Sequence, residues 1–243
     1  MQSQDRFHHG ASFARARAVK ADTFGVLCEA LQKAHASRVI DLGCGHGEMA
    51  TRLAAAGFQM TGLDPSSAAL EAARERSREI EYILGSAEAA PFQNESFDAA
   101  YFLNALHHVP PQHMRKAVLT ALDLVHPDGI VVVIEPMATG SFFRAMRPVE
   151  DETEIRTLAA HAIDQLIADG EVRLLDLRRW DRENCFASLE DFVGYLVAVD
   201  PQRAETVQRN NAQLTRAWRE NITVRDNRAC LMQPLICWTL ARR

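Results

Sequence analysis

The amino-acid sequence predicts an α/β protein with a Rossmann-like, mostly parallel seven-stranded sheet, helices on both faces and a helical cap insertion. Strand-like runs alternate with helix-period stretches through the first half of the chain, as in a parallel sheet. The apolar run 130–134 shows no polar alternation, which is typical of a strand covered on both faces. About fifty residues separate the last two predicted strands, too many for a hairpin turn.

Each predicted strand is bounded by turn-forming residues. The predicted strands are 38–42, 59–63, 81–84, 97–103, 130–135, 172–177 and 231–240. Apolar residues at helical spacing from Met49 to Gly57 predict a helix after the first strand. An amphipathic stripe with acids in its first turn predicts another helix over 150–169. Pro234 indicates that the last strand lies at an edge or contains a bulge there.

The segment between the sixth and seventh predicted strands needs structure of its own. Apolar spacing predicts a short helix over 189–196 and a second over 204–219, which we interpret as a helical cap. With 243 residues, the chain has the length of one domain plus a modest insertion. We expect a single domain. Its expected parts are a core of about 21–136, 150–180 and 228–243, a cap of about 186–225, and an N-terminal arm of 1–20.

The composition excludes several classes of partner and location. The formal net charge is −5, from 27 basic and 32 acidic residues, so we expect no nucleic-acid partner. No uninterrupted apolar run is long enough to span a bilayer, and the polar start resembles no secretory signal. We therefore expect a cytoplasmic protein without a membrane span.

The five cysteines are widely spaced and odd in number, and they contain no Cys-x-x-Cys pair. In a cytoplasmic chain this pattern indicates neither a disulfide framework nor a zinc site. We expect reduced thiols at Cys28, Cys44, Cys185, Cys230 and Cys237, and no bound metal.

The most informative stretch is 39–48, in which a buried strand runs through alternate glycines at Gly43, Gly45 and Gly47 into a helix. Glycine permits positive φ and close approach of a ligand, and the helix start offers free N–H groups. Glu48 stands where a dinucleotide fingerprint needs glycine, and the Gly-Lys-Ser/Thr end of a phosphate-binding loop is absent. Asp41 favours a ligand carrying ammonium or sulfonium charge.

Asp64 ends the second predicted strand, about 20 residues after the glycines. A carboxylate at this point can accept both hydroxyls of a ribose. N-capping of the next helix is the alternative, and Ser66 is an equally good cap.

With these residues the sequence resembles the class I S-adenosylmethionine-dependent methyltransferases, especially the ubiquinone/menaquinone C-methyltransferases and many small-molecule methyltransferases. The resemblance covers about 38–135. Its five markers, in the family's order, are 41–47 (Asp-Leu-Gly-Cys-Gly-His-Gly), 63–66 (Leu-Asp-Pro-Ser), 85–92, 97–109 and 124–129.

The resemblance implies S-adenosylmethionine as cofactor. It assigns the methionine part to Asp41, Gly43, Cys44 and Gly45, and the ribose to Asp64 and Pro65. Ser86, Ala87 and Glu88 are expected around the adenine. The family usually has aspartate where Ser86 stands, so the contact to the adenine amino group weakens or passes to Glu88. Asn104 is expected to face the reacting end of the cofactor.

Methyl transfer needs a base only when the acceptor loses a proton. His107 and His108 follow Asn104 and are the candidate catalytic bases, although the family carries such a pair whatever the acceptor. The expected activity is methyl transfer to an unidentified small-molecule acceptor. The alternative is a regulatory or sensor protein that binds the cofactor without catalysis.

Overall fold

The computed structural model describes residues 21–243, so the predicted N-terminal arm lies outside the described residues. Within 21–243, eight strands form one mixed sheet in the order β3-β2-β1-β4-β5-β8-β6, and β7 pairs with β8. The strands are β1 (Arg38–Leu42), β2 (Gln59–Asp64), β3 (Glu81–Leu84), β4 (Phe97–Leu103), β5 (Val125–Pro136), β6 (Val172–Phe186), β7 (Thr223–Arg225) and β8 (Arg228–Arg242). The predicted α/β fold class is confirmed, with the short β7 as an additional strand.

Strands β1 to β5 are parallel, and β8 lies antiparallel between β5 and β6. The chain order reverses at β1, since β2 lies on one side of it and β4 on the other. In an open α/β sheet, ligands bind beyond the carboxyl ends of the strands at such a reversal. The fold therefore places the glycine turn after β1 at the expected crevice.

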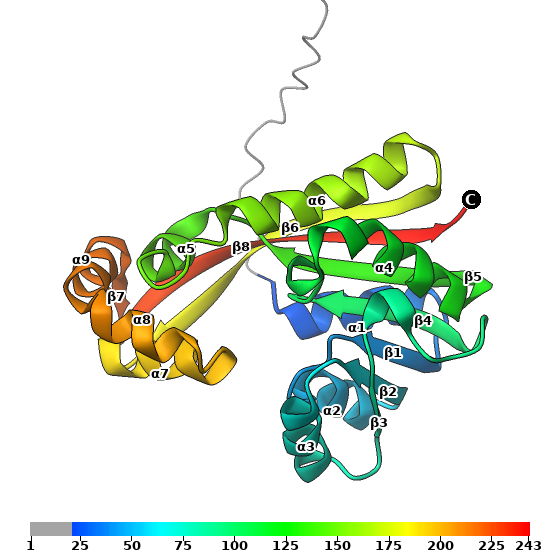
Figure 1. Ribbon diagram of the computed structural model, residues 1–243, viewed down its shortest axis with the longest axis horizontal. Helices are drawn as coiled ribbons and strands as arrows, with labels where there is room; N and C mark the ends of the chain where they lie inside the picture. The colour runs from blue at the N-terminus through cyan, green and yellow to red at the C-terminus, as the bar shows by residue number, and fades with distance from the viewer. Residues whose placement is uncertain (1–20) are drawn as a thin grey trace, which may run out of the picture.

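Helices cover both faces of the sheet. They are α1 (Thr23–Lys33), α2 (Glu48–Ala55), α3 (Ser67–Arg76), α4 (Pro111–Leu124), α5 (Gly140–Met146), α6 (Thr153–Ala168), α7 (Leu189–Val199), α8 (Arg203–Arg209) and α9 (Asn211–Asn221), with 3-10 turns η1 (Ala87–Ala89) and η2 (Leu106–His108). Helices α4 and α6 pack on one face of the sheet, and α1, α2 and α3 pack on the other (Figure 1). The wholly buried run 130–134 of β5 is thus covered twice, as its composition predicts.

Two long strands connect the cap to the core. Figure 1 shows β6 and β8 running out of the core toward α5, α7, α8 and α9. An aromatic cluster that includes Phe142, Phe186, Phe192 and Trp218 holds these helices together. The predicted second cap helix is interrupted at Asn210, which gives α8 and α9. No helix within 21–243 has both the length and the apolar run needed to cross a bilayer.

Pro234 lies inside β8, opposite Asp181 of β6. The pairing of β8 with β5 ends one residue later in the chain, at Leu235 opposite Pro136. Strand β8 lies between β5 and β6, so the prediction of an edge strand is wrong for β8 as a whole. Pro234 is tolerated because it lies just beyond the ladder with β5, where no N–H is needed on that side.

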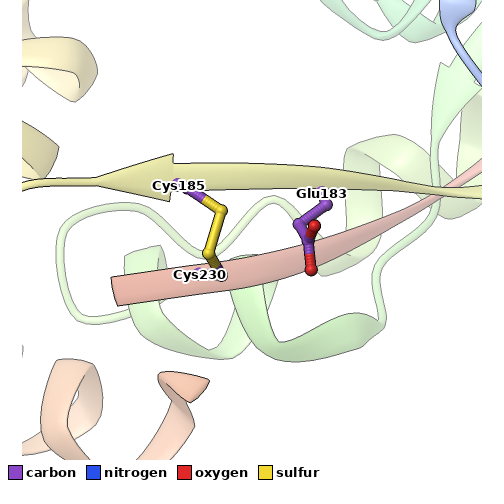
Figure 2. A group of neighbouring side chains, drawn as sticks. All are labelled: Glu183, Cys185 and Cys230. Carbon is purple, nitrogen blue, oxygen red and sulfur yellow. A yellow bond between two sulfur atoms is a disulfide. The ribbon is translucent and has the colours of Figure 1, made fainter. Parts of the chain in front are cut away.

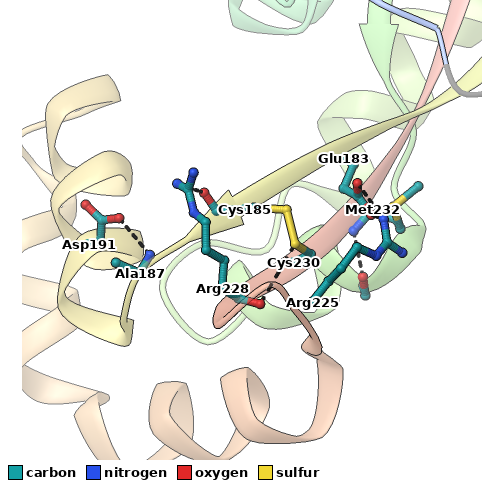
Figure 3. The surroundings of a disulfide bond; sticks show 9 residues. Glu183, Cys185, Ala187, Asp191, Arg225, Arg228, Cys230 and Met232 are labelled. Atoms are coloured by element: carbon teal, nitrogen blue, oxygen red, sulfur yellow. Dashed lines mark hydrogen bonds and ion pairs between the residues drawn. A yellow bond between two sulfur atoms is a disulfide. The ribbon is translucent and has the colours of Figure 1, made fainter.

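The expectation that all five cysteines are thiols is wrong, because Cys185 and Cys230 form a disulfide. The two residues lie opposite each other on antiparallel β6 and β8, with their Cα atoms 4.0 Å apart. They are 45 residues apart in sequence, so only the strand register brings them together. Figure 3 shows the disulfide at the base of the cap, beside the hydrogen bond from Arg228 to the Cys185 carbonyl.

Glu183 lies next to this disulfide (Figure 2). Its carboxylate and the two sulfurs are within 4.8 Å of one another, a grouping of metal-ligand types. Because the sulfurs are bonded to each other, neither offers a thiolate to a metal. Glu183 instead receives hydrogen bonds from Arg225 at the end of β7.

We predict that Cys230→Ser lowers the free energy of unfolding. Closing a loop of 45 residues in the unfolded chain corresponds to about 4 kcal/mol of stabilisation in the loop-entropy model. Urea unfolding checks this, with Cys28→Ser as the control because Cys28 is a free cysteine. A reductant is expected to lower the free energy of unfolding of the wild type and of the control by the same amount as Cys230→Ser. Equal stability of Cys230→Ser and wild type would contradict the prediction.

Candidate functional site

The turn after β1 is shaped by glycine. Gly43 and Gly45 have φ of +83° and +51°, a region that side chains rarely adopt. A Cβ on Gly43 would lie 2.6 Å from the Cβ of Ala105, so the turn packs directly against the start of η2. A Cβ on Gly45 would meet no heavy atom within 4 Å, and Gly45 lines a cavity. The turn therefore presents bare backbone to that cavity.

We call this space the main cavity; it has a volume of about 700 Å³ and lies at the carboxyl ends of the parallel strands. That volume falls in the usual range for small-molecule and cofactor sites. Its wall includes Gly43, Gly45, Asp64, Pro65, Ser86, Ala87, Glu88, Asn104 and His108, and on the cap side Val199, Asp200 and Pro201. The fold thus brings together most of the residues predicted around the cofactor.

Asp64 is tied to the glycine turn. Its carboxylate accepts the Gly45 N–H at 2.8 Å and the Ser66 N–H at 2.9 Å. The Ser66 hydroxyl, rather than Asp64, caps α3 by accepting from Ala69. Since a carboxylate has about four acceptor positions, Asp64 retains acceptor capacity toward the main cavity.

Asp41 and Cys44 lie behind the cavity wall instead of on it. The Asp41 carboxylate is 2% exposed and accepts the Tyr101 hydroxyl at 2.6 Å. Burial raises the pKa of Asp41 to about 7, although the Tyr101 hydrogen bond acts in the opposite direction. Burial likewise raises the pKa of the Cys44 thiol, so this residue is a neutral packing group. Tyr101, on β4, was not identified from the sequence.

Asn104 occupies the junction between two cavities. It has φ of +52°, a left-handed conformation fixed in part by the bond from its N–H to the Ile134 carbonyl. Its side-chain oxygen is buried and accepts no hydrogen bond among the described residues. A strained backbone with an unsatisfied acceptor on a cavity wall is a feature of ligand-binding positions.

A buried dyad lies beside Asn104. One oxygen of Glu135, at the end of β5, accepts the N–H groups of Ala105 and Leu106 at 3.1 and 2.8 Å. The other oxygen contacts His107 Nδ1, and both side chains are almost fully buried. Because a carboxylate accepts, the tautomer that fits this contact has its proton on Nδ1 and its acceptor at Nε2. The arrangement orients His107 as a base.

His108 lines both cavities. Although the side chain is exposed toward the cavities, desolvation by the surrounding protein, with the adjacent His107 as a smaller cause, lowers the pKa of His108 to about 4. The ring is therefore neutral at physiological pH and can donate or accept a hydrogen bond without adding charge.

A smaller cavity, which we call the side cavity, has a volume of about 90 Å³ and meets the main cavity at Asn104, His108 and Val199. Its other lining residues are His107, Pro136, Phe142, Met146, Glu152, Arg156, Arg182, Tyr195, Leu196, Arg203 and Gln233. Sequence patterns identified none of its three arginines, because they come from α6, β6 and α8. Only the folded arrangement of core and cap brings them together.

The comparisons with known proteins agree with this fold. The family model described as "Methyltransferase domain" matches residues 39–129. A ubiquinone biosynthesis O-methyltransferase of Stutzerimonas stutzeri is 32% identical over 65% of this chain and 67% of its own length. A demethylmenaquinone methyltransferase of Renibacterium salmoninarum is 34% identical over 51% of each chain. The chain spans about half the length of many of the curated relatives it matches.

Solved structures extend the likeness to the whole fold. The YcgJ protein of Bacillus subtilis superposes with a TM-score of 0.61 at 18% sequence identity, covering 90% of this chain and 98% of that one. At this identity the likeness concerns the fold alone.

We predict that Asp41→Asn removes a pH dependence of stability. The folded pKa of about 7 lies above the ordinary aspartate value of 3.8, so the native state holds this proton more tightly. The stabilisation by protonated Asp41 is fully present below pH 3.8 and is lost as the pH rises through about 7. Relative to wild type, the variant is expected to gain stability on the order of a few kcal/mol between those limits.

Urea midpoints from pH 4 to 8 measure this effect, with exposed Asp128→Asn as the control. A difference between Asp41→Asn and wild type that stays constant with pH would contradict the assignment.

Proposed function

The chain belongs to the class I S-adenosylmethionine-dependent methyltransferases, and on that premise we propose that it transfers a methyl group from S-adenosylmethionine to a small-molecule acceptor. The observation that carries the proposal is the junction at Asn104. There the main cavity, which has the size of a cofactor site, meets the side cavity beside a buried histidine–carboxylate dyad.

The residues of the main cavity fit the proposed cofactor. Asp64 has acceptor capacity for the ribose hydroxyls, and the open face of Gly45 leaves room for the methionine part. The unsatisfied oxygen of Asn104 suits the methionine ammonium, a donor with three N–H groups. Ser86, Ala87 and Glu88 remain the proposed surroundings of the adenine.

Asp41 and Cys44 have a different part in this proposal. Neither lines the main cavity, so we propose no direct hydrogen bond from Asp41 to the cofactor. When ionised, its buried carboxylate places negative charge behind the glycine turn, which attracts ammonium and sulfonium groups. Cys44 fills the space beneath Gly62.

The dyad supplies the protein's part in the chemistry. S-adenosylmethionine bound in the main cavity would supply an electrophilic methyl group, with its thioether as the leaving group. His107 Nε2 takes the proton that the acceptor nucleophile loses, while Glu135 holds the ring and stabilises its protonated form. Neutral His108 orients the acceptor at the junction.

The compartment belongs to the proposal as well. The proposed location is the cytoplasm, as expected from the sequence. The Cys185–Cys230 disulfide is evidence against this location, because disulfides persist mainly in oxidising compartments.

We predict that Asp64→Ala weakens S-adenosylmethionine binding by about 1–3 kcal/mol, because charge-assisted hydrogen bonds to the ribose are lost. Calorimetric titration measures this effect. Asp128→Ala is the control, since Asp128 is exposed and distant in sequence from the wall of the main cavity. Unchanged affinity in Asp64→Ala would remove the ribose assignment, and absence of binding to wild type at high micromolar ligand would remove the proposed function.

We predict that His107→Gln and Glu135→Gln each lower methyl transfer about 10²- to 10⁴-fold, the usual contribution of a positioned base. Cofactor affinity is expected to stay near the wild-type value, because neither residue lines the main cavity and the amide oxygen of Glu135→Gln can still accept the N–H groups of Ala105 and Leu106. The readout is formation of S-adenosylhomocysteine with cell extract as the source of acceptor. His161→Gln is the control on an exposed position of α6. Full activity in both dyad variants would show that no base is needed here.

A further inference from the structure

The side cavity is the part of the site whose ligand the proposed function leaves unnamed. It opens beyond the junction at Asn104, and its walls come from η2, α5, α6, the long strands β6 and β8, and the cap. His107 lines this cavity and is absent from the lining of the main cavity. A molecule placed in the side cavity therefore has a base beside it and the junction in front of it.

Charge in the side cavity is unevenly compensated. Glu152 lies between two arginines and accepts from Arg156 Nε at 2.8 Å and from Arg203 Nη2 at 2.9 Å. Arg203 also donates to Glu150 at 2.6 Å. Both arginines are less than 9% exposed, and their charges are compensated by the carboxylates of Glu150 and Glu152.

Arg182 differs from them. It projects from β6 at the position paired with Gln233 of β8 and lines the side cavity. Its Nε is buried without a hydrogen-bond partner among the described residues. Asn184 Nδ2, two residues along the same face of the strand, is buried and unsatisfied as well. The oxygen of Gln233 accepts a hydrogen bond from Arg156 at 3.4 Å and none from Arg182.

The Nε atom is too buried to meet a ligand directly, but Arg182 lines the cavity and its guanidinium has no ion pair with a carboxylate among the described residues. An uncompensated cationic side chain on a cavity wall indicates a ligand with a complementary acceptor. A guanidinium group matches a carboxylate through two parallel hydrogen bonds. The chemistry of the wall therefore favours an anionic oxygen ligand over a neutral or cationic one.

The size of the side cavity restricts the ligand further. Its volume of about 90 Å³ is well below the ~150 Å³ of a cavity that accepts benzene, so the part of the acceptor held inside it is smaller than an aromatic ring. We propose that the methyl acceptor is a short aliphatic carboxylic acid bearing an amine or hydroxyl nucleophile, with its carboxylate bound by Arg182 and its nucleophile facing His107. This inference rests on the proposed function, since it names the substrate class of the same site.

The test measures binding of simple probes to the protein saturated with S-adenosylhomocysteine. Propionate and β-alanine represent the acid, and propionamide is the neutral counterpart of nearly the same shape. Calorimetry or ligand-detected NMR is expected to show at least about tenfold tighter binding of the acids than of the amide, as for a hydrogen bond to a charged group. Arg182→Met is expected to abolish that difference, whereas Arg182→Lys is expected to retain part of it.

Arg179→Met is the matched control, because Arg179 lies on the same strand, is exposed and projects from the opposite face. Thermal unfolding establishes that each variant is folded. Equal binding of acid and amide by wild type, no binding of either, or an unchanged preference in Arg182→Met would each overturn the inference.

The same experiments distinguish failure of the proposed function from failure of the proposed acceptor class. Absence of S-adenosylhomocysteine binding counts against the cofactor assignment, and the probe titrations are then repeated on the protein alone, where Arg182 still makes the same prediction. A protein that binds the cofactor product but shows no preference for acids retains the proposed function and loses only the acceptor class.

Discussion

The buried carboxylate of Glu135 is the interaction on which the site depends. It stands at the end of β5 and holds the backbone of η2 through the N–H groups of Ala105 and Leu106, while its second oxygen contacts His107. Three donors thus meet this buried carboxyl group and compensate for its removal from water. By fixing η2, Glu135 also fixes Asn104 and His108, the residues at which the two cavities meet.

The second constraint is the length of β6 and β8. Both strands extend past the parallel core, and the cap helices are joined to their ends (Figure 1). The disulfide between Cys185 and Cys230 fixes the register of these extensions close to the cap. Because Arg182 stands on β6 between the core and the disulfide, the same register determines where its guanidinium lies on the wall of the side cavity.

The parallel core was predictable because strands covered on both faces are continuously apolar, as in 130–134. The extension of β6 beyond residue 177 was not predictable, since its sequence is mostly polar and carries no apolar pattern that marks a strand. Asp64 could be located by its spacing from the glycine turn. The hydrogen-bond partner of Asp41 could not be located from the sequence. Tyr101 belongs to another strand, and only the pairing of β1 with β4 places it beside Asp41.

Side-chain positions in the side cavity, like the pairing of Cys185 with Cys230, follow from contacts between residues distant in sequence. A crystal structure of the protein with S-adenosylhomocysteine tests the account most directly. We expect the ribose hydroxyls on Asp64 and the sulfur at the junction of the two cavities, facing Asn104 and the dyad of His107 and Glu135. A ligand whose sulfur points away from that junction, or a main cavity closed by the protein's own side chains, would contradict the account.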